Sequence, residues 1–113
     1  MFGSVSFEAM TSALDAMSLR QRTIADNIAN IQTPGFQARR VVFEDALSSA
    51  VARGSGAVDA TVARSLEPTR EDGNNVNLDT ETVANIDTVL RYELATRAVE
   101  GKFTQLRTAM GTA

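Results

Sequence analysis

The apolar residues in the first third of the chain recur at intervals of three and four positions. This stripe consists of Phe7, Met10, Leu14, Met17, Ile24, Ile28 and Ile31. Gln21 occupies one position of the repeat, and the hydroxyl of Ser4 or Ser6 can cap the start by accepting a hydrogen bond from an unpaired backbone N–H. The spacing predicts an amphipathic helix over about residues 4–31.

The segment "TPGF" predicts a tight turn after this helix. Thr33 precedes a proline and is therefore disfavoured in the helical conformation, while Pro34 and Gly35 suit the two central positions of a type II turn. We expect the turn to occupy residues 32–37 and to fix the direction in which the chain leaves the helix. Phe36 then either packs back onto the helix or anchors in a neighbouring molecule.

The middle of the chain has weaker signals. A short apolar set has helical spacing: Phe43, Leu47, Ala50 and Val51. It predicts a short helix over about residues 43–52, and an extended start at Val41 and Val42 fits equally well. Residues 53–78 mix Gly, Ser, Pro, Asp and Asn without a sustained period, so we expect a long irregular connector there.

A second long helix is predicted over about residues 79–110, opened by Asp79 or Thr80. One apolar stripe on it consists of Val83, Ile86, Leu90 and Leu94. Another stripe, shifted around the axis, consists of Val89, Tyr92, Val99, Phe103, Leu106 and Met110. A single neighbouring helix cannot cover both stripes.

These elements predict an all-α fold. Long N- and C-terminal amphipathic helices pack as a coiled-coil-like pair, joined by a short helix and a long irregular connector. A lone helix pair leaves part of its apolar surface in water, so we expect copies of the chain or other partners to cover the remainder.

Composition narrows the possible functions. The chain has 113 residues, a net charge of −3, and neither cysteine nor histidine. The acidic balance argues against nucleic-acid binding, and the missing side chains are the usual ones for thiol nucleophiles, zinc sites and proton transfer near neutral pH. We therefore expect no enzyme activity, small-molecule substrate, cofactor or metal site.

Two other sequence features bear on partners and location. The run "DGNN", residues 72–75, lacks the later glycine and glutamate of a calcium-binding loop, and we expect a turn that leads to the last helix. The N-terminus has no basic region followed by an apolar run, so we expect no cleaved secretory signal.

The run "ADNIANIQTPGF", residues 25–36, resembles the signature A-x-N-[IL]-A-N-x-x-T-P-G-[FY] of the flagellar axial proteins of the rod and hook. The segments "ARRVVFEDAL", "DGNNVNLDTETV" and "LRYELATRAVEGKFTQLRTAM" are similar to those of the flagellar basal-body rod proteins. The resemblance covers both ends of the chain, whereas residues 53–71 carry little of it.

The resemblance implies a structural subunit of the proximal rod of the bacterial flagellar basal body. It implies a single rod-subunit domain over residues 1–113 that self-assembles and co-assembles through its terminal helices into an axial tube. The implied partners are copies of the chain, other flagellar rod proteins, the adaptor at the rod base, and export-gate and membrane-ring proteins. The implied location is the rod, reached by export across the inner membrane, and it is periplasmic in a cell with two membranes.

The expected assembly interface combines the two helices and the turn. Its members are Met10, Leu14, Met17, Ile24, Asn27, Ile28, Asn30, Ile31, Thr33, Pro34, Gly35, Phe36, Leu90, Leu94, Val99, Phe103, Leu106 and Met110. Asn27 and Asn30 have two interpretations, either helix capping or contact with a neighbour. An alternative function is that of a small secreted helical-hairpin interaction protein or adaptor.

Overall fold

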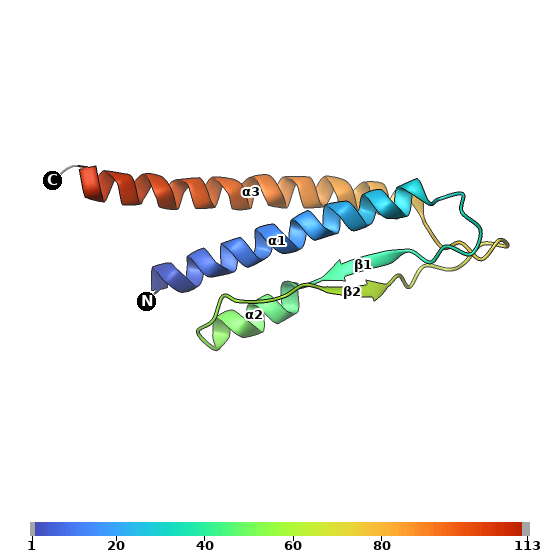
Figure 1. The fold of residues 1–113 in the computed structure, drawn as a ribbon, viewed down its shortest axis with the longest axis horizontal. Coiled ribbons are helices and arrows are strands. Elements are labelled where there is room, and N and C mark those ends of the chain that lie inside the picture. Colours follow the sequence, from blue (N-terminus) through green and yellow to red (C-terminus); the bar gives the residue numbers. More distant parts are fainter. Residues whose placement is uncertain (1, 112–113) are drawn as a thin grey trace.

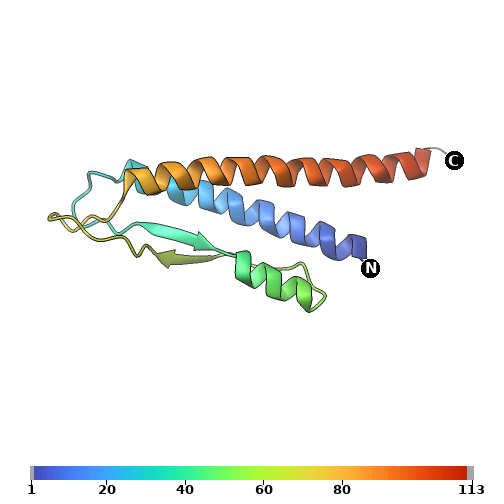
Figure 2. The same cartoon turned by 180° about the vertical axis from the view of Figure 1, so that it is seen from behind.

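The computed structural model describes residues 2–111, which form three layers (Figure 1). In chain order the elements are α1 (Phe2–Ala29), β1 (Arg39–Val42), α2 (Glu44–Ala52), β2 (Thr61–Arg64) and α3 (Leu78–Gly111). The helices α1 and α3 run antiparallel, and α1 lies between α3 and a layer made of β1, α2 and β2 (Figures 1 and 2). The molecule is elongated, measuring 66 × 26 × 15 Å.

The predicted all-α class is confirmed, with one small addition. The three helices begin and end within two residues of their expected bounds. The last helix opens at Leu78, because the Asn77 side-chain oxygen accepts hydrogen bonds from the backbone N–H groups of Asp79 and Thr80 at 3.1 and 3.2 Å. Asn77 is therefore the cap, in place of the expected Asp79 or Thr80.

The expected irregular connector over residues 53–78 needs a correction. Its residues 61–64 form β2, which pairs antiparallel with β1 in the register Arg39↔Arg64 to Val42↔Thr61. The extended alternative for Val41 and Val42 is thus the one observed. A four-residue strand shows almost no alternation of its own, and only its pairing with a distant segment reveals it.

The core lies where the three layers meet, and it is small. Ala16 and Met17 of α1 pack with Val41 and Phe43, and partly buried residues of α2 and α3 surround this cluster. Ile24 of α1 is also buried. Arg20 ties the layers together, since its guanidinium donates to the carbonyl of Val41 at 2.7 Å and lies 4.9 Å from the centre of the Phe43 ring.

Arg20 also forms an ion pair with Glu44, at 2.6 Å, in the first turn of α2. Burial works to raise the pKa of this carboxyl, but the hydrogen bond and the charge of Arg20 outweigh it and lower the pKa. The ionised pair therefore attaches α2 to α1 at neutral pH.

The chain after α2 returns along α1. The backbone N–H of Gly56 donates to the Glu8 carboxylate at 2.9 Å, and its carbonyl accepts from the Ser12 hydroxyl at 2.6 Å. Gly56 is buried because the two backbones touch there. None of the described helices combines the length and apolar character that a membrane crossing needs.

We predict that Gly56→Ala destabilises the protein by about 1–3 kcal/mol, because the added Cβ would lie 2.4 Å from the backbone nitrogen of Ala9 and 2.5 Å from the carbonyl oxygen of Val5. Urea unfolding followed by circular dichroism measures the change. Gly101→Ala is the matched control, since a Cβ there meets no atom within 4 Å and replaces a glycine inside a helix. An equal loss of stability in both variants would contradict the prediction.

Candidate assembly surface and tip junction

The end of α1 lies beside the start of α3, and we call this end of the molecule the tip (residues 30–38 and 67–78). The predicted type II turn is present there. The backbone N–H of Phe36 donates to the Thr33 carbonyl at 3.2 Å, and Gly35 has φ of 75°. Gly35 is thus in the left-handed region that the second central position of this turn requires. Thr33, Pro34 and Gly35 are exposed, whereas Phe36 is half-buried.

Asn27 is completely buried and connects three elements. Its side-chain oxygen accepts from the backbone N–H of Arg39 at 3.1 Å, and its amide donates to the Arg39 carbonyl at 2.7 Å. The same amide donates to Glu81 of α3 at 2.9 Å. A side chain of α1 thereby pairs with β1 as a neighbouring strand would.

Asn30 has a local role at the end of α1. Its amide donates to the Asp26 carbonyl at 2.8 Å, and its side-chain oxygen accepts from the Thr33 hydroxyl at 3.1 Å. Asn30 therefore satisfies a terminal helix carbonyl, as the capping interpretation expects. It does so without the left-handed conformation, since over residues 2–111 only glycines have positive φ.

Two asparagines that the sequence analysis did not select complete the tip. The fully buried Asn74 donates to the carbonyls of Asn30 and Thr33, both at 2.8 Å, and so caps the end of α1 from a segment 41 or more residues away. Asn75 accepts from the backbone N–H of Ala38 at 2.6 Å. The "DGNN" run does lead to the last helix as a turn, and it also binds the first helix.

The backbones of the two tip segments approach closely. The N–H of Gly35 donates to the Asp72 carbonyl at 2.8 Å, and a Cβ on Gly73 would lie 3.3 Å from the Gly35 Cα. In the part of the chain that the structure describes, every buried side-chain nitrogen and oxygen has a hydrogen-bond partner. The tip is thus a satisfied polar junction, a kind of arrangement that specifies one geometry.

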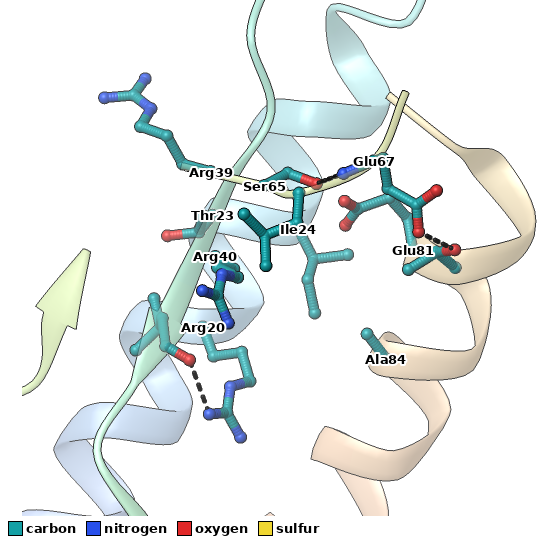
Figure 3. Close-up of a pocket in the computed structure, with 12 residues that line it drawn as sticks. Arg20, Thr23, Ile24, Arg39, Arg40, Ser65, Glu67, Glu81 and Ala84 are labelled. Atoms are coloured by element: carbon teal, nitrogen blue, oxygen red, sulfur yellow. Dashed lines mark hydrogen bonds between the residues drawn. The ribbon is translucent and has the colours of Figure 1, made fainter. Parts of the chain in front are cut away.

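A cavity of about 360 Å³ opens beside this junction, between α1, β1 and the start of α3 (Figure 3). Glu67 and Glu81 lie on its α3 side, while Arg39 extends away from it toward an ion pair with Asp26 at 3.3 Å. Burial raises the pKa of Glu81, the nearby charge of Glu67 raises it further, and the hydrogen bond from Asn27 opposes the rise. No group of three metal-ligating side chains occurs within residues 2–111.

The two apolar stripes of α3 differ only in part. Tyr92 and Val99 of one stripe are half-buried, whereas its other members are exposed, namely Val89, Phe103, Leu106 and Met110. The other stripe, which we call the outer stripe, consists of Val83, Ile86, Leu90 and Leu94, and its side chains are 57–71% exposed. The prediction that one helix cannot cover both stripes is confirmed for this chain.

The structure distributes the expected interface residues over three environments. Buried inside the chain are Met17, Ile24 and Asn27. Half-buried are Met10, Leu14, Ile28, Asn30, Ile31, Phe36 and Val99. Exposed are Thr33, Pro34, Gly35, Leu90, Leu94, Phe103, Leu106 and Met110. The exposed group includes the turn, part of the outer stripe and the last turns of α3.

The long helix pair and the TPGF turn are the features that the resemblance to the flagellar axial proteins leads us to expect. The family described as "Flagella basal body rod protein" matches residues 7–37. Over 74% of its length the chain is 36% identical to the flagellar basal body rod protein FlgB of Borrelia hermsii, covering 78% of that protein. It is 32% identical to FlgB of Escherichia coli over 80% of the chain and 81% of the relative, and 27% identical to FlgB of Bacillus subtilis over 95% and 94%.

The chain therefore belongs to the FlgB family of flagellar basal body rod proteins. The resemblance found in the sequence is confirmed. The family is that of structural components of the basal body rod.

We predict that Asn27→Ala destabilises the protein by about 3 kcal/mol, because both backbone groups of Arg39 and the Glu81 carboxylate lose a buried partner. Asn30→Ala is the matched control, three residues further along the chain, and it should cost less than about 1 kcal/mol since its bonds are local and partly exposed. Urea unfolding compares the two variants. Equal losses would mean that Asn27 does not hold the junction together.

We predict that Glu81→Gln stabilises the protein at neutral pH. The folded protein binds the Glu81 proton more tightly than the unfolded chain does. The free energy of unfolding therefore falls as pH rises from the ordinary pKa of glutamate through the raised pKa of Glu81. Glutamine keeps an oxygen that accepts from Asn27 and carries no charge. The difference in unfolding free energy between variant and wild type should grow with pH across that range. A difference that is independent of pH would refute this.

Proposed function

We propose that the chain self-assembles and co-assembles through its terminal helices into the axial drive-shaft tube of the proximal rod, as a non-catalytic structural subunit. The observation that carries this proposal is the outer stripe of α3. Its four aliphatic side chains face away from α1 and are more than half exposed. A contiguous apolar stripe of this kind on a helix is typical of a surface that another helix covers.

The apolar area of the outer stripe favours lateral packing between subunits. Covering an aliphatic side chain that is about 60% exposed contributes on the order of 1 kcal/mol, so the four residues of the outer stripe contribute about 4 kcal/mol at each contact. Each subunit in a closed tube has neighbours on both sides, and such contacts add along the assembly. The exposed Phe103, Leu106 and Met110 extend the available apolar surface.

The buried members of the expected interface position the helices and do not themselves contact a neighbour. Met17 and Ile24 hold α1 in the core, and Asn27 fixes the position of α3 through Glu81. The exposed residues of the turn and of α3 make the contacts. The half-buried residues of α1 contribute the area that remains accessible beside them.

The proposed partners follow from the position of a proximal subunit. They are copies of this chain, other flagellar rod proteins, the adaptor at the rod base, and export-gate and membrane-ring proteins. The subunit reaches the rod by export across the inner membrane, and in a cell with two membranes the assembled rod lies in the periplasm. The family membership and the absence of histidine and cysteine from the chain support a role in assembly.

Deletion of the gene from the source bacterium tests the function. We expect cells without flagella in which the membrane ring is still assembled, and restoration of motility by the wild-type gene. A motile deletion strain would exclude the proposed role.

We predict that Leu90→Lys abolishes this restoration while leaving the isolated chain folded. Leu90 is 60% exposed, so a lysine there costs the single chain little, but a lateral contact would have to bury its charge. Leu66→Lys is the control, since Leu66 is more exposed and lies off the outer stripe. Motility of the complemented strain and the helix content of the purified variants are the measurements. Full motility with Leu90→Lys would show that the outer stripe is not an assembly contact.

A further inference from the structure

The cavity beside the tip junction is lined by one buried carboxylate that is only half satisfied. Glu81 is 8% exposed, and its Oε1 accepts a hydrogen bond from the Asn27 amide at 2.9 Å. Its second oxygen, Oε2, has no hydrogen bond to any group within residues 2–111. Every enclosed side-chain nitrogen and oxygen in that range does have a partner, so Oε2 is accessible. The space that it reaches is the cavity of about 360 Å³ that Glu81 lines (Figure 3).

The arginines that line the same cavity have partners elsewhere. Arg20 forms its ion pair with Glu44 at 2.6 Å, and Arg39 forms one with Asp26 at 3.3 Å. The third, Arg40, donates from Nε to a backbone carbonyl of β2 at 3.1 Å. None of the three forms an ion pair with a carboxylate of the cavity.

The other carboxylate of the cavity, that of Glu67, is satisfied by neutral groups. One of its oxygens accepts from the Thr80 hydroxyl at 3.0 Å and the other from the Asn77 amide at 3.3 Å. The two ion pairs of the lining arginines cancel, so Arg40 against Glu67 and Glu81 leaves a net charge of −1 at the cavity. Glu81 is thus the place where a positive charge is missing.

Apolar groups supply the inner lining. Ile24 and Val41 are 5% and 4% exposed, and Ala84 is half-buried. The volume lies at the lower end of the range of small-molecule sites, and apolar walls with a few convergent polar groups are typical of such sites. A matching ligand has a short apolar body and a positively charged hydrogen-bond donor at one end.

From this arrangement we propose that the cavity binds a small diffusible organic cation, an alkylammonium or alkylguanidinium. Its charged head donates to Oε2 of Glu81, and its alkyl body packs on Ile24 and Val41. A hydrogen bond between two charged groups is roughly twice as strong as one between neutral groups, so this contact dominates recognition. A bare metal ion fits less well, because no group of three metal-ligating side chains occurs within residues 2–111. The inference goes beyond the proposed function and does not depend on the outer stripe.

The state of Glu81 in the free protein favours cation binding. Burial, with the nearby charge of Glu67, raises the pKa of Glu81, so the ionised carboxylate is unfavourable there. A cation that donates to Oε2 stabilises the ionised form. By linkage, binding of the cation must lower the pKa of Glu81.

Titration of the full chain with n-butylamine at neutral pH, followed by NMR, tests the site. We expect saturable chemical-shift changes at Glu81, Ile24, Val41 and Ala84, with a Kd on the order of millimolar for a ligand of so few atoms. n-Butanol has the same alkyl body without the charge, and the ammonium ion has the charge without the body. Each should bind about tenfold more weakly or worse.

Three variants assign the binding to the carboxylate. Glu81→Gln removes the charge and should weaken n-butylamine binding by about tenfold or more. Because this variant is expected to be the more stable protein at neutral pH, lost binding cannot be attributed to unfolding. Glu71→Gln is the matched control, since it removes an exposed carboxylate of the tip that does not line the cavity, and it should bind like the wild type. Arg40→Gln removes a cation from the lining and should tighten binding.

The pKa of Glu81 gives a second readout. In an NMR pH titration it should fall when n-butylamine is present and stay unchanged with n-butanol.

Several results would overturn the inference. These are the absence of a saturable shift at the cavity residues, equal binding of n-butylamine and n-butanol, and binding that Glu81→Gln does not weaken. Shifts of Glu81 that grow with protein concentration alone would mean that a basic side chain of a second copy fills the cavity, and would also overturn it. Each of these results leaves the Leu90 experiment unaffected, because that experiment tests lateral packing.

Discussion

The hydrogen bonds at the tip set the register of the two long helices. Asn27 binds both backbone groups of Arg39 and the carboxylate of Glu81, so α1, β1 and α3 have one alignment in which all three are satisfied. Asn74 donates hydrogen bonds to the carbonyls of Asn30 and Thr33, and so holds the segment before α3 at a fixed distance from the end of α1. A shift of one residue at this point would turn α3 by about 100° and present a different face to α1. The polar junction therefore decides which residues of α3 are covered and which remain exposed.

Over the first turns of α3, the face that this register turns toward α1 is composed of small or polar residues. It includes Glu81, Ala84 and Thr88, of which Glu81 and Thr88 are buried, and Tyr92 and Ala95 pack against the core further along the helix. The larger aliphatic side chains of the outer stripe lie on the opposite side. A chain selected only for stability as a monomer would bury its larger side chains and expose its small and polar ones. The inverted arrangement is consistent with a surface that is covered after the chain has folded.

The sequence predicted the long helices well because their apolar residues keep a helical period over many turns. It also predicted the type II turn, since Pro34 and Gly35 each restrict the backbone in the required way. It did not predict β2, which depends on pairing with a segment more than 18 residues earlier in the chain. The buried roles of Asn74 and Asn75 were missed for a related reason, because polar residues carry no hydrophobic period and their partners lie far away in the sequence. A local pattern of residues predicts an element, whereas a contact between distant segments leaves no local pattern from which to predict it.

The difference between local and long-range contacts also explains why Asn27 and Asn30 have different roles. Asn27 and Asn30 are alike in the sequence and lie three residues apart, yet one bridges three elements inside the chain and the other closes a single turn. Only the packing of β1 and α3 around Asn27 makes it different. Because the tip satisfies its own hydrogen bonds, it holds its shape without a neighbour, and the outer stripe of α3 can be presented in the same orientation by every copy. An internal polar junction combined with an uncovered apolar face would suit the proposed assembly, because the geometry is fixed within each chain and the remaining apolar area is left for contacts between chains.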